Sequence, residues 1–191
     1  MDTQADEGLR PMKLTNTATE YGLLTRILHW CVALLMIVLI GLGWWMVSLS
    51  YYDRWYHDAT QWHKALGMLV LIIASAKVLW SMLNHAVQLS ANLKHWERVA
   101  ARTTHVTFLL LMVLIPSTGY VVSTSAANGI TIFGWFEVPA MFAISTAVRD
   151  WAITIHYWSA YGLAVLALLH AAAAIKHQLV DRDGTLRRML W

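Results

Sequence analysis

The sequence is constrained most by the apolar stretch from Trp151 to His177, which is long enough to cross a membrane as a helix. His156 and His170 lie fourteen residues apart within it. At 3.6 residues per turn this step is close to four turns, so both rings leave one side of the helix, about 21 Å apart along its axis. Two imidazoles at two depths of one membrane helix suit the ligation of two stacked haems.

The composition indicates a membrane protein. Of the 191 residues, 58% are apolar and only 13% are charged, and the charged residues cluster outside four apolar blocks. We therefore predict an all-α membrane protein, a four-transmembrane-helix bundle holding two b haems, with spans at about 25–48, 60–84, 100–125 and 151–177. The single cysteine, Cys31, excludes a Cys-x-x-Cys-His attachment, so haem is expected to bind non-covalently.

The segments outside the spans predict the topology. Residues 1–22 are expected to be an N-terminal tail, disordered at its start and without a cleavable signal; residues 23–180 form the membrane domain, and residues 181–191 a basic tail. A short amphipathic element on the membrane is expected within residues 126–150. Of the fourteen lysines and arginines, all but Arg54, Lys64 and Arg149 lie on the side of the termini. This bias predicts that both termini are cytoplasmic.

Depth sorts four histidines into two pairs. His29 lies near the inner end of the first span, at the depth of His170, and His63 lies near the outer end of the second span, at the depth of His156. Ionisable residues within spans are costly and usually functional. Two neutral imidazoles from facing helices suit a low-spin electron-transfer haem. We therefore predict His29/His170 and His63/His156 as the axial ligands of two haem irons.

The same fourteen-residue step places glycines near the outer haem. Gly43 follows His29 by fourteen residues, and Gly119 follows His105 by fourteen. A missing side chain leaves room for a macrocycle against the backbone, so both glycines are candidates for haem packing. Gly67, one turn beyond His63, is a third candidate.

Other ionisable residues lie near the inner haem. Lys77 follows His63 by fourteen residues and is a candidate partner for an inner haem propionate. His105, early in the third span, and His177, seven residues beyond His170, either line a quinone pocket beside that haem or extend to the inner interface. The remaining histidines are expected in solvated loops: His57, His85 and His95.

Several motifs resemble the bacterial cytochrome b-561 family over nearly the whole chain after about residue 18. They are Arg-Ile-Leu-His29-Trp30, Trp62-His63-Lys-Ala-Leu-Gly67, Ala101-Arg102 with His105, Pro116 to Tyr120, Phe133-Gly-Trp-Phe, His156 through His170, Lys176-His177, and Asp181-Arg-Asp-Gly-Thr-Leu-Arg-Arg-Met. The resemblance implies a four-helix dihaem b protein of the bacterial inner membrane. It is nearest the subgroup whose genes neighbour those of small periplasmic lipid-binding proteins, so a periplasmic lipid-binding or redox partner is a candidate.

The resemblance also implies an electron-transfer function. One characterised member of the family oxidises superoxide at its outer face and reduces ubiquinone, so we expect an oxidoreductase with a periplasmic-side donor and ubiquinone as bound substrate. The chain departs from the family near the expected quinone region. Lys77 stands in place of the usual arginine, Ser81 stands at a later basic position, and residues 85–96 replace a proline-rich linker.

Two other functions are compatible with the sequence. The chain could be a cytochrome b anchor subunit that passes quinol electrons to a periplasmic redox partner. It could also be a haem-free transporter lined by the same histidines, although their matched depths argue against this. Superoxide steering has little support, because only Lys64 and Arg149 lie close to the outer pair and Asp150 adjoins Arg149. No feature indicates a nucleic-acid partner.

Overall fold

Four long α-helices dominate the structure, a computed structural model that describes residues 13–90 and 92–190. They are α1 (Leu23–Ser48), α2 (Tyr56–Leu83), α3 (His95–Thr124) and α4 (Thr146–Leu179). Each is long and apolar enough to cross a membrane, which confirms the predicted four-helix fold. Helices α2, α3 and α4 begin about one turn before the predicted spans, because their polar first turns continue the helix beyond the apolar blocks.

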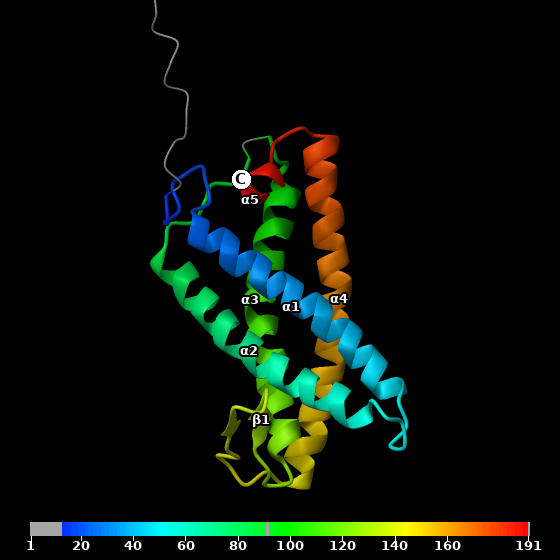
Figure 1. Cartoon of the computed structure of the whole chain (residues 1–191). Coiled ribbons are helices and arrows are strands. Elements are labelled where there is room, and N and C mark those ends of the chain that lie inside the picture. Colours follow the sequence, from blue (N-terminus) through cyan, green and yellow to red (C-terminus); the bar gives the residue numbers. More distant parts are fainter. Residues whose placement is uncertain (1–12, 91, 191) are drawn as a thin grey trace, which may run out of the picture.

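The helices form two antiparallel pairs, α1 with α2 and α3 with α4, and the pairs are inclined to each other (Figure 1). Contacts between α2 and α3 join the pairs, whereas α4 has little direct contact with α1 or α2 in the described part of the chain. The starts of α1 and α3 and the ends of α2 and α4 lie at one end of the bundle, here called the terminal end. The opposite end is called the hairpin end.

The apolar interior is narrow and most large apolar side chains face outward. One buried cluster joins the helices: Val32, Met36, Leu39, Val70, Ala74, Met112, Ile115 and Leu163. Exposed apolar side chains occur on all four helices, among them Ile37, Ile72, Leu110 and Leu168. This distribution suits a bundle surrounded by lipid, in which outward apolar side chains are solvated by hydrocarbon.

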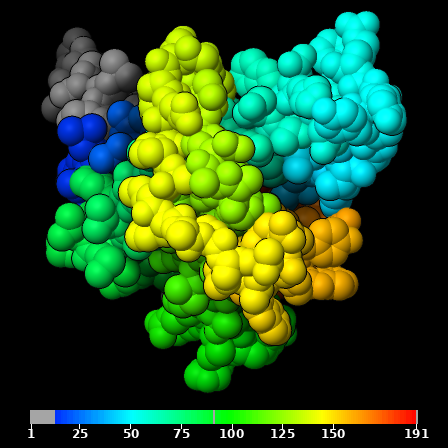
Figure 2. All heavy atoms as spheres, turned by 90° about the horizontal axis from the view of Figure 1, so that it is seen from below, coloured from blue at the N-terminus to red at the C-terminus, as the bar shows by residue number. Residues whose placement is uncertain are grey.

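The segment between α3 and α4, where the sequence predicted a short amphipathic element, contains a β-hairpin. Strands β1 (Ile130–Ile132) and β2 (Phe136–Val138) pair antiparallel. Phe133 and Gly134 both have positive φ angles, 50° and 77°, as the turn requires. The hairpin packs against α2, and the ring of Phe133 lies 5.4 Å from that of Trp62. Figure 2 views the molecule from the hairpin end, and the segment around the hairpin, in yellow-green and yellow, crosses the middle of that view.

The segments next to the two termini pack on the terminal end. The Asn16 backbone N–H donates to Asn84 Oδ1 (3.3 Å), and Asn16 Nδ2 donates to the His85 carbonyl (2.9 Å). At the other terminus, the Trp30 indole donates to the carbonyl of Met189 (3.0 Å), within the short helix α5 (Arg187–Leu190). The predicted disorder at the start of the N-terminal tail concerns residues 1–12, which lie outside the described residues.

Candidate functional site: two clusters of histidines

The first cluster lies toward the hairpin end, where α2 and α4 face each other. The rings of His63 and His156 are 6.2 Å apart, centroid to centroid, and inclined by 71°. Both line a mainly apolar cavity that is partly open at the surface, together with Gly43 and Gly67. A large apolar cavity with a few convergent polar groups is typical of a cofactor pocket.

His156 is held by the backbone of α3. Its Nδ1 lies 2.8 Å from the Ile115 carbonyl oxygen and 3.3 Å from Thr118 Oγ1. A carbonyl can only accept, so Nδ1 must carry the proton that it donates to Ile115. Nε2 then has its lone pair available for a metal, as in metal-ligating histidines whose second nitrogen donates to a backbone carbonyl.

Two glycines lie against these rings. A Cβ added at Gly43 would lie 3.2 Å from Cε1 of His63, and one added at Gly119 would lie 3.1 Å from Cε1 of His156. His63 Nδ1 is buried without a hydrogen-bond partner in the described structure. The residues present therefore fit a b haem: two convergent imidazoles, an apolar cavity, and close backbone at two glycines.

The second cluster lies toward the terminal end. The rings of His105 and His170 are 5.6 Å apart, and the ring of Phe108 is 5.4 Å from that of His170. His29 is within electrostatic range of both histidines and of Lys77. The structure thus brings together all three histidines and the lysine that the sequence placed at this depth. The ring in direct contact with His170 is that of His105, which the sequence had not predicted.

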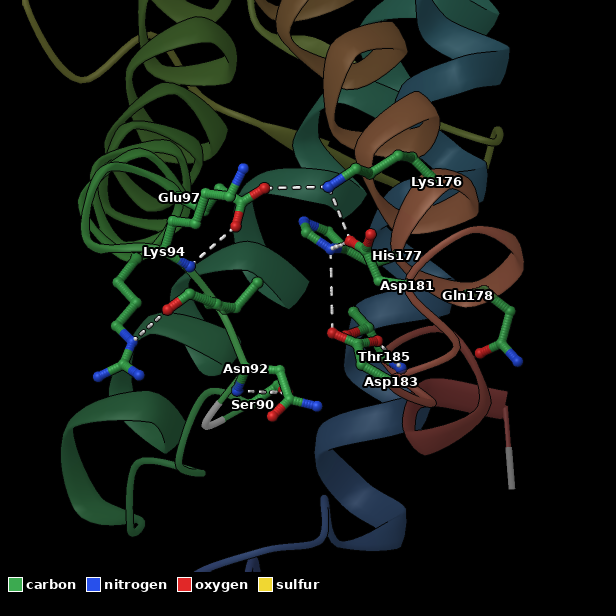
Figure 3. Close-up of polar contacts among 12 residues, drawn as sticks. Ser90, Asn92, Lys94, Glu97, Lys176, His177, Gln178, Asp181, Asp183 and Thr185 are labelled. Carbon is green, nitrogen blue, oxygen red and sulfur yellow. Dashed lines mark hydrogen bonds and ion pairs between the residues drawn. The ribbon is translucent and has the colours of Figure 1, made fainter.

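His177 lies in a separate group of charged side chains near the end of α4. Its Nδ1 is 2.5 Å from Asp181 Oδ2 and 3.9 Å from Asp183 Oδ2. Lys176 bridges Asp181 (2.7 Å) and Glu97 of α3 (3.0 Å), as Figure 3 shows. Sequence reasoning missed this group, although the motif Lys-His followed by Asp-x-Asp contains four of its members. The three histidines expected in solvated loops are exposed, but only His85 lies in a loop: His57 is in the first turn of α2, and His95 is the first residue of α3.

Four apolar helices with paired, partly buried histidines at two levels define a b-type membrane cytochrome. The model of the prokaryotic cytochrome b561 family matches residues 20–191. The chain belongs to this family. It is 39% identical over 179 residues to cytochrome b561 homolog 2 of Escherichia coli (strain K12), an alignment that covers 94% of this chain and 95% of that relative.

Family membership sets the general function. The protein is a multi-pass membrane protein that binds b haem and transfers electrons across the membrane. This agrees with the predicted class of function and gives no support to the haem-free transporter.

Proposed function

We propose that the protein carries electrons through two b haems, from a donor on the hairpin side to ubiquinone near the terminal end. His63 and His156 hold one haem, and His29 and His170 hold the other. The observation that carries the proposal is the pair His63/His156, which faces across an apolar cavity with Nδ1 of His156 fixed on the Ile115 carbonyl. A b haem supplies reversible one-electron chemistry, and the chain supplies ligation, orientation and an apolar environment.

Helix packing supports His29, rather than His105, as the second ligand beside His170. A macrocycle needs a gap between the two helices that ligate it. Helices α3 and α4 pack directly on each other, so a haem between His105 and His170 would have to separate them. Helix α4 has little contact with α1, so a ring of His29 and a ring of His170 can face each other across an opening.

His105 and Lys77 are then free for other roles at the terminal end. Lys77 lies near His29 and His105, which supports the proposal that its ammonium pairs with a haem propionate. His105 contacts His170 and is proposed to line the quinone site and to exchange a proton with a quinone oxygen. His177 pairs with Asp181 instead, so we propose that it takes the other role that the sequence allowed, at the inner interface.

The distribution of basic residues supports the orientation. Lys94, Arg98 and Arg102 lie at the start of α3, and Lys176 at the end of α4, all at the terminal end. We propose that this end is cytoplasmic and that the membrane is the bacterial inner membrane.

The charges on the outer side give little support to superoxide as the electron donor. Arg149 is ion-paired with the adjacent Asp150 at 2.9 Å, and both are exposed, so Arg149 adds little net positive potential on the outer side. This ion pair favours the second candidate function, an anchor subunit that exchanges electrons between quinol and a periplasmic redox partner. The two functions use the same haem ligands and differ in donor and direction.

The test is a pyridine haemochrome assay on quantified protein purified in mild detergent. We expect two b haems per parent chain. Each of the four single variants, His63→Ala, His156→Ala, His29→Ala and His170→Ala, should keep only one. His105→Ala should keep both haems, and the exposed His57→Ala serves as the matched control. Loss of a haem in His105→Ala with both retained in His29→Ala would reverse the assignment of the ligand beside His170.

Donor assays then separate the two functions. Reduction of the haems by superoxide faster than its spontaneous dismutation supports the superoxide version. Reduction by quinol but not by superoxide supports the anchor subunit. A protein without haem that is well folded would contradict both.

A further inference from the structure

Outside the haem region, three carboxylates and one imidazole converge at the terminal end from α3, α4 and the segment after α4 (Figure 3). One ligand atom each from Glu97, His177 and Asp181 lies within 4.8 Å of the others. Asp183 adds a third carboxylate, 3.9 Å from His177 Nδ1. We call these four residues the carboxylate–histidine cluster.

The burial of the Asp183 carboxylate is not explained by the ion pairs of this cluster. Its side chain is only 2% exposed. Oδ1 accepts a hydrogen bond from the Thr185 backbone N–H (2.9 Å), but the buried Oδ2 has no hydrogen-bond partner in the described structure. The nearest cationic group to this buried oxygen is the His177 imidazole, 3.9 Å away, so its charge is incompletely compensated and its position suits a positively charged ligand.

The ammonium of Lys176 neutralises part of the negative charge of this cluster. Its ammonium bonds Glu97 and Asp181, yet its side chain is 46% exposed. A long, flexible lysine can move its ammonium into water at small cost. Of the three carboxylates in the cluster, Lys176 pairs with those of Glu97 and Asp181 and not with that of Asp183. The cluster therefore keeps an excess of acidic ligands even when Lys176 is bound.

We propose that Glu97, His177, Asp181 and Asp183 bind one divalent transition-metal ion, with Zn²⁺ as the probe, and that the ion displaces the Lys176 ammonium into solvent. One imidazole nitrogen with carboxylate oxygens is a donor set that Zn²⁺ accepts in tetrahedral geometry. Binding releases the Nδ1 proton of His177 where that nitrogen carries one, because a metal ligand must be deprotonated. The ion links α3, α4 and the segment before α5, and this site does not depend on which histidines ligate the haems.

The experiment measures Zn²⁺ bound to the haem-loaded full chain, purified with a tag that contains no histidine. The protein is dialysed against buffered free Zn²⁺, and bound zinc is measured by mass spectrometry and counted per chain. We expect one Zn²⁺ per chain. Asp183→Asn and His177→Gln should each weaken binding by about tenfold or more, as loss of a ligand or its partner does. His57→Gln, which changes an exposed histidine at the hairpin end, should bind as the parent does.

Lys176→Gln gives the result that separates a metal site from a purely structural ion-pair network. If Lys176 competes with the ion, its removal should tighten Zn²⁺ binding by up to about fivefold, the value of an exposed ion pair. Unchanged or weaker binding in Lys176→Gln, with the haem spectrum retained, would overturn the proposal. Equal binding in the parent and in both Asp183→Asn and His177→Gln would also overturn it, since the zinc would then lie elsewhere.

Discussion

If His156 ligates a haem as proposed, replacement of Gly119 by alanine should raise the midpoint potential of that haem. The new Cβ would lie 3.1 Å from Cε1 and 3.3 Å from Nδ1 of His156, closer than ordinary van der Waals contact. The ring must therefore move by a few tenths of an ångström. Nδ1 makes a 2.8 Å hydrogen bond to Ile115 on the same helix as Gly119, so this displacement weakens that bond.

The size and sign of the effect follow from the role of that hydrogen bond. Donation from Nδ1 to a carbonyl increases the electron density that Nε2 gives to a metal, which favours ferric over ferrous iron. A neutral hydrogen bond contributes about 1 kcal/mol, which corresponds to about 40 mV for a one-electron couple. Because the bond is weakened rather than removed, we expect an upward shift of roughly 10 to 40 mV.

With the two haems that we propose, an optical redox titration measures both midpoint potentials in one sample. The control is Gly162→Ala on α4, where an added Cβ meets nothing within 4 Å. The potential of the haem ligated by His170 should stay unchanged in both variants. A downward shift in Gly119→Ala, or no shift with the haem spectrum intact, would refute the role given to the Ile115 carbonyl.

Two further predictions concern other close contacts. In Gly43→Ala the new Cβ would lie 3.2 Å from Cε1 of His63, whose Nδ1 has no hydrogen bond to lose in the described structure. We therefore expect faster transfer of haem to apomyoglobin, with a smaller change in midpoint potential than in Gly119→Ala. An equal shift in potential in the two variants would contradict this. Asn16→Ala removes the side-chain hydrogen bonds that tie the N-terminal segment to the His85 carbonyl after α2 and to Gly22 and Thr25 at the start of α1, and should cost about 1–2 kcal/mol and lower the melting temperature in detergent. Ser81→Ala, whose hydroxyl bonds only its own helix, is the control, and equal melting of the two variants would disprove the effect.

Periodicity and depth predicted much of the fold and the positions of the candidate ligands. The fourteen-residue step on α4 needs only the pitch of a helix, and the order of the spans then assigns a depth to each histidine. The structure has His63 facing His156 and has Gly43 and Gly119 against their rings. These features were accessible because each depends on position along a helix, which the sequence contains directly.

The features that the sequence did not predict depend on how a helix is rotated about its own axis and on the path of the chain between and after the helices. The contact of His105 with His170 follows from how α3 turns about its axis against α4. The hairpin between α3 and α4 has strands of three residues, too short for a clear alternating pattern. The burial of Asp183 follows from the turn that the chain makes after α4, in a segment that composition alone describes only as basic and polar.

The position of both α4 histidines connects the fold to its cofactors. In the described part of the chain, α1 packs closely on α2, α2 on α3 and α3 on α4, whereas α4 meets α1 and α2 only slightly. Among the described residues of α4, the longest helix, only Ala152 and Leu163 are buried. Apolar side chains in lipid give little drive for helices to associate, so packing alone holds α4 weakly against α1 and α2. Ligation of both irons by α4 would close these two contacts, which makes haem binding part of the folding of α4 as well as of electron transfer.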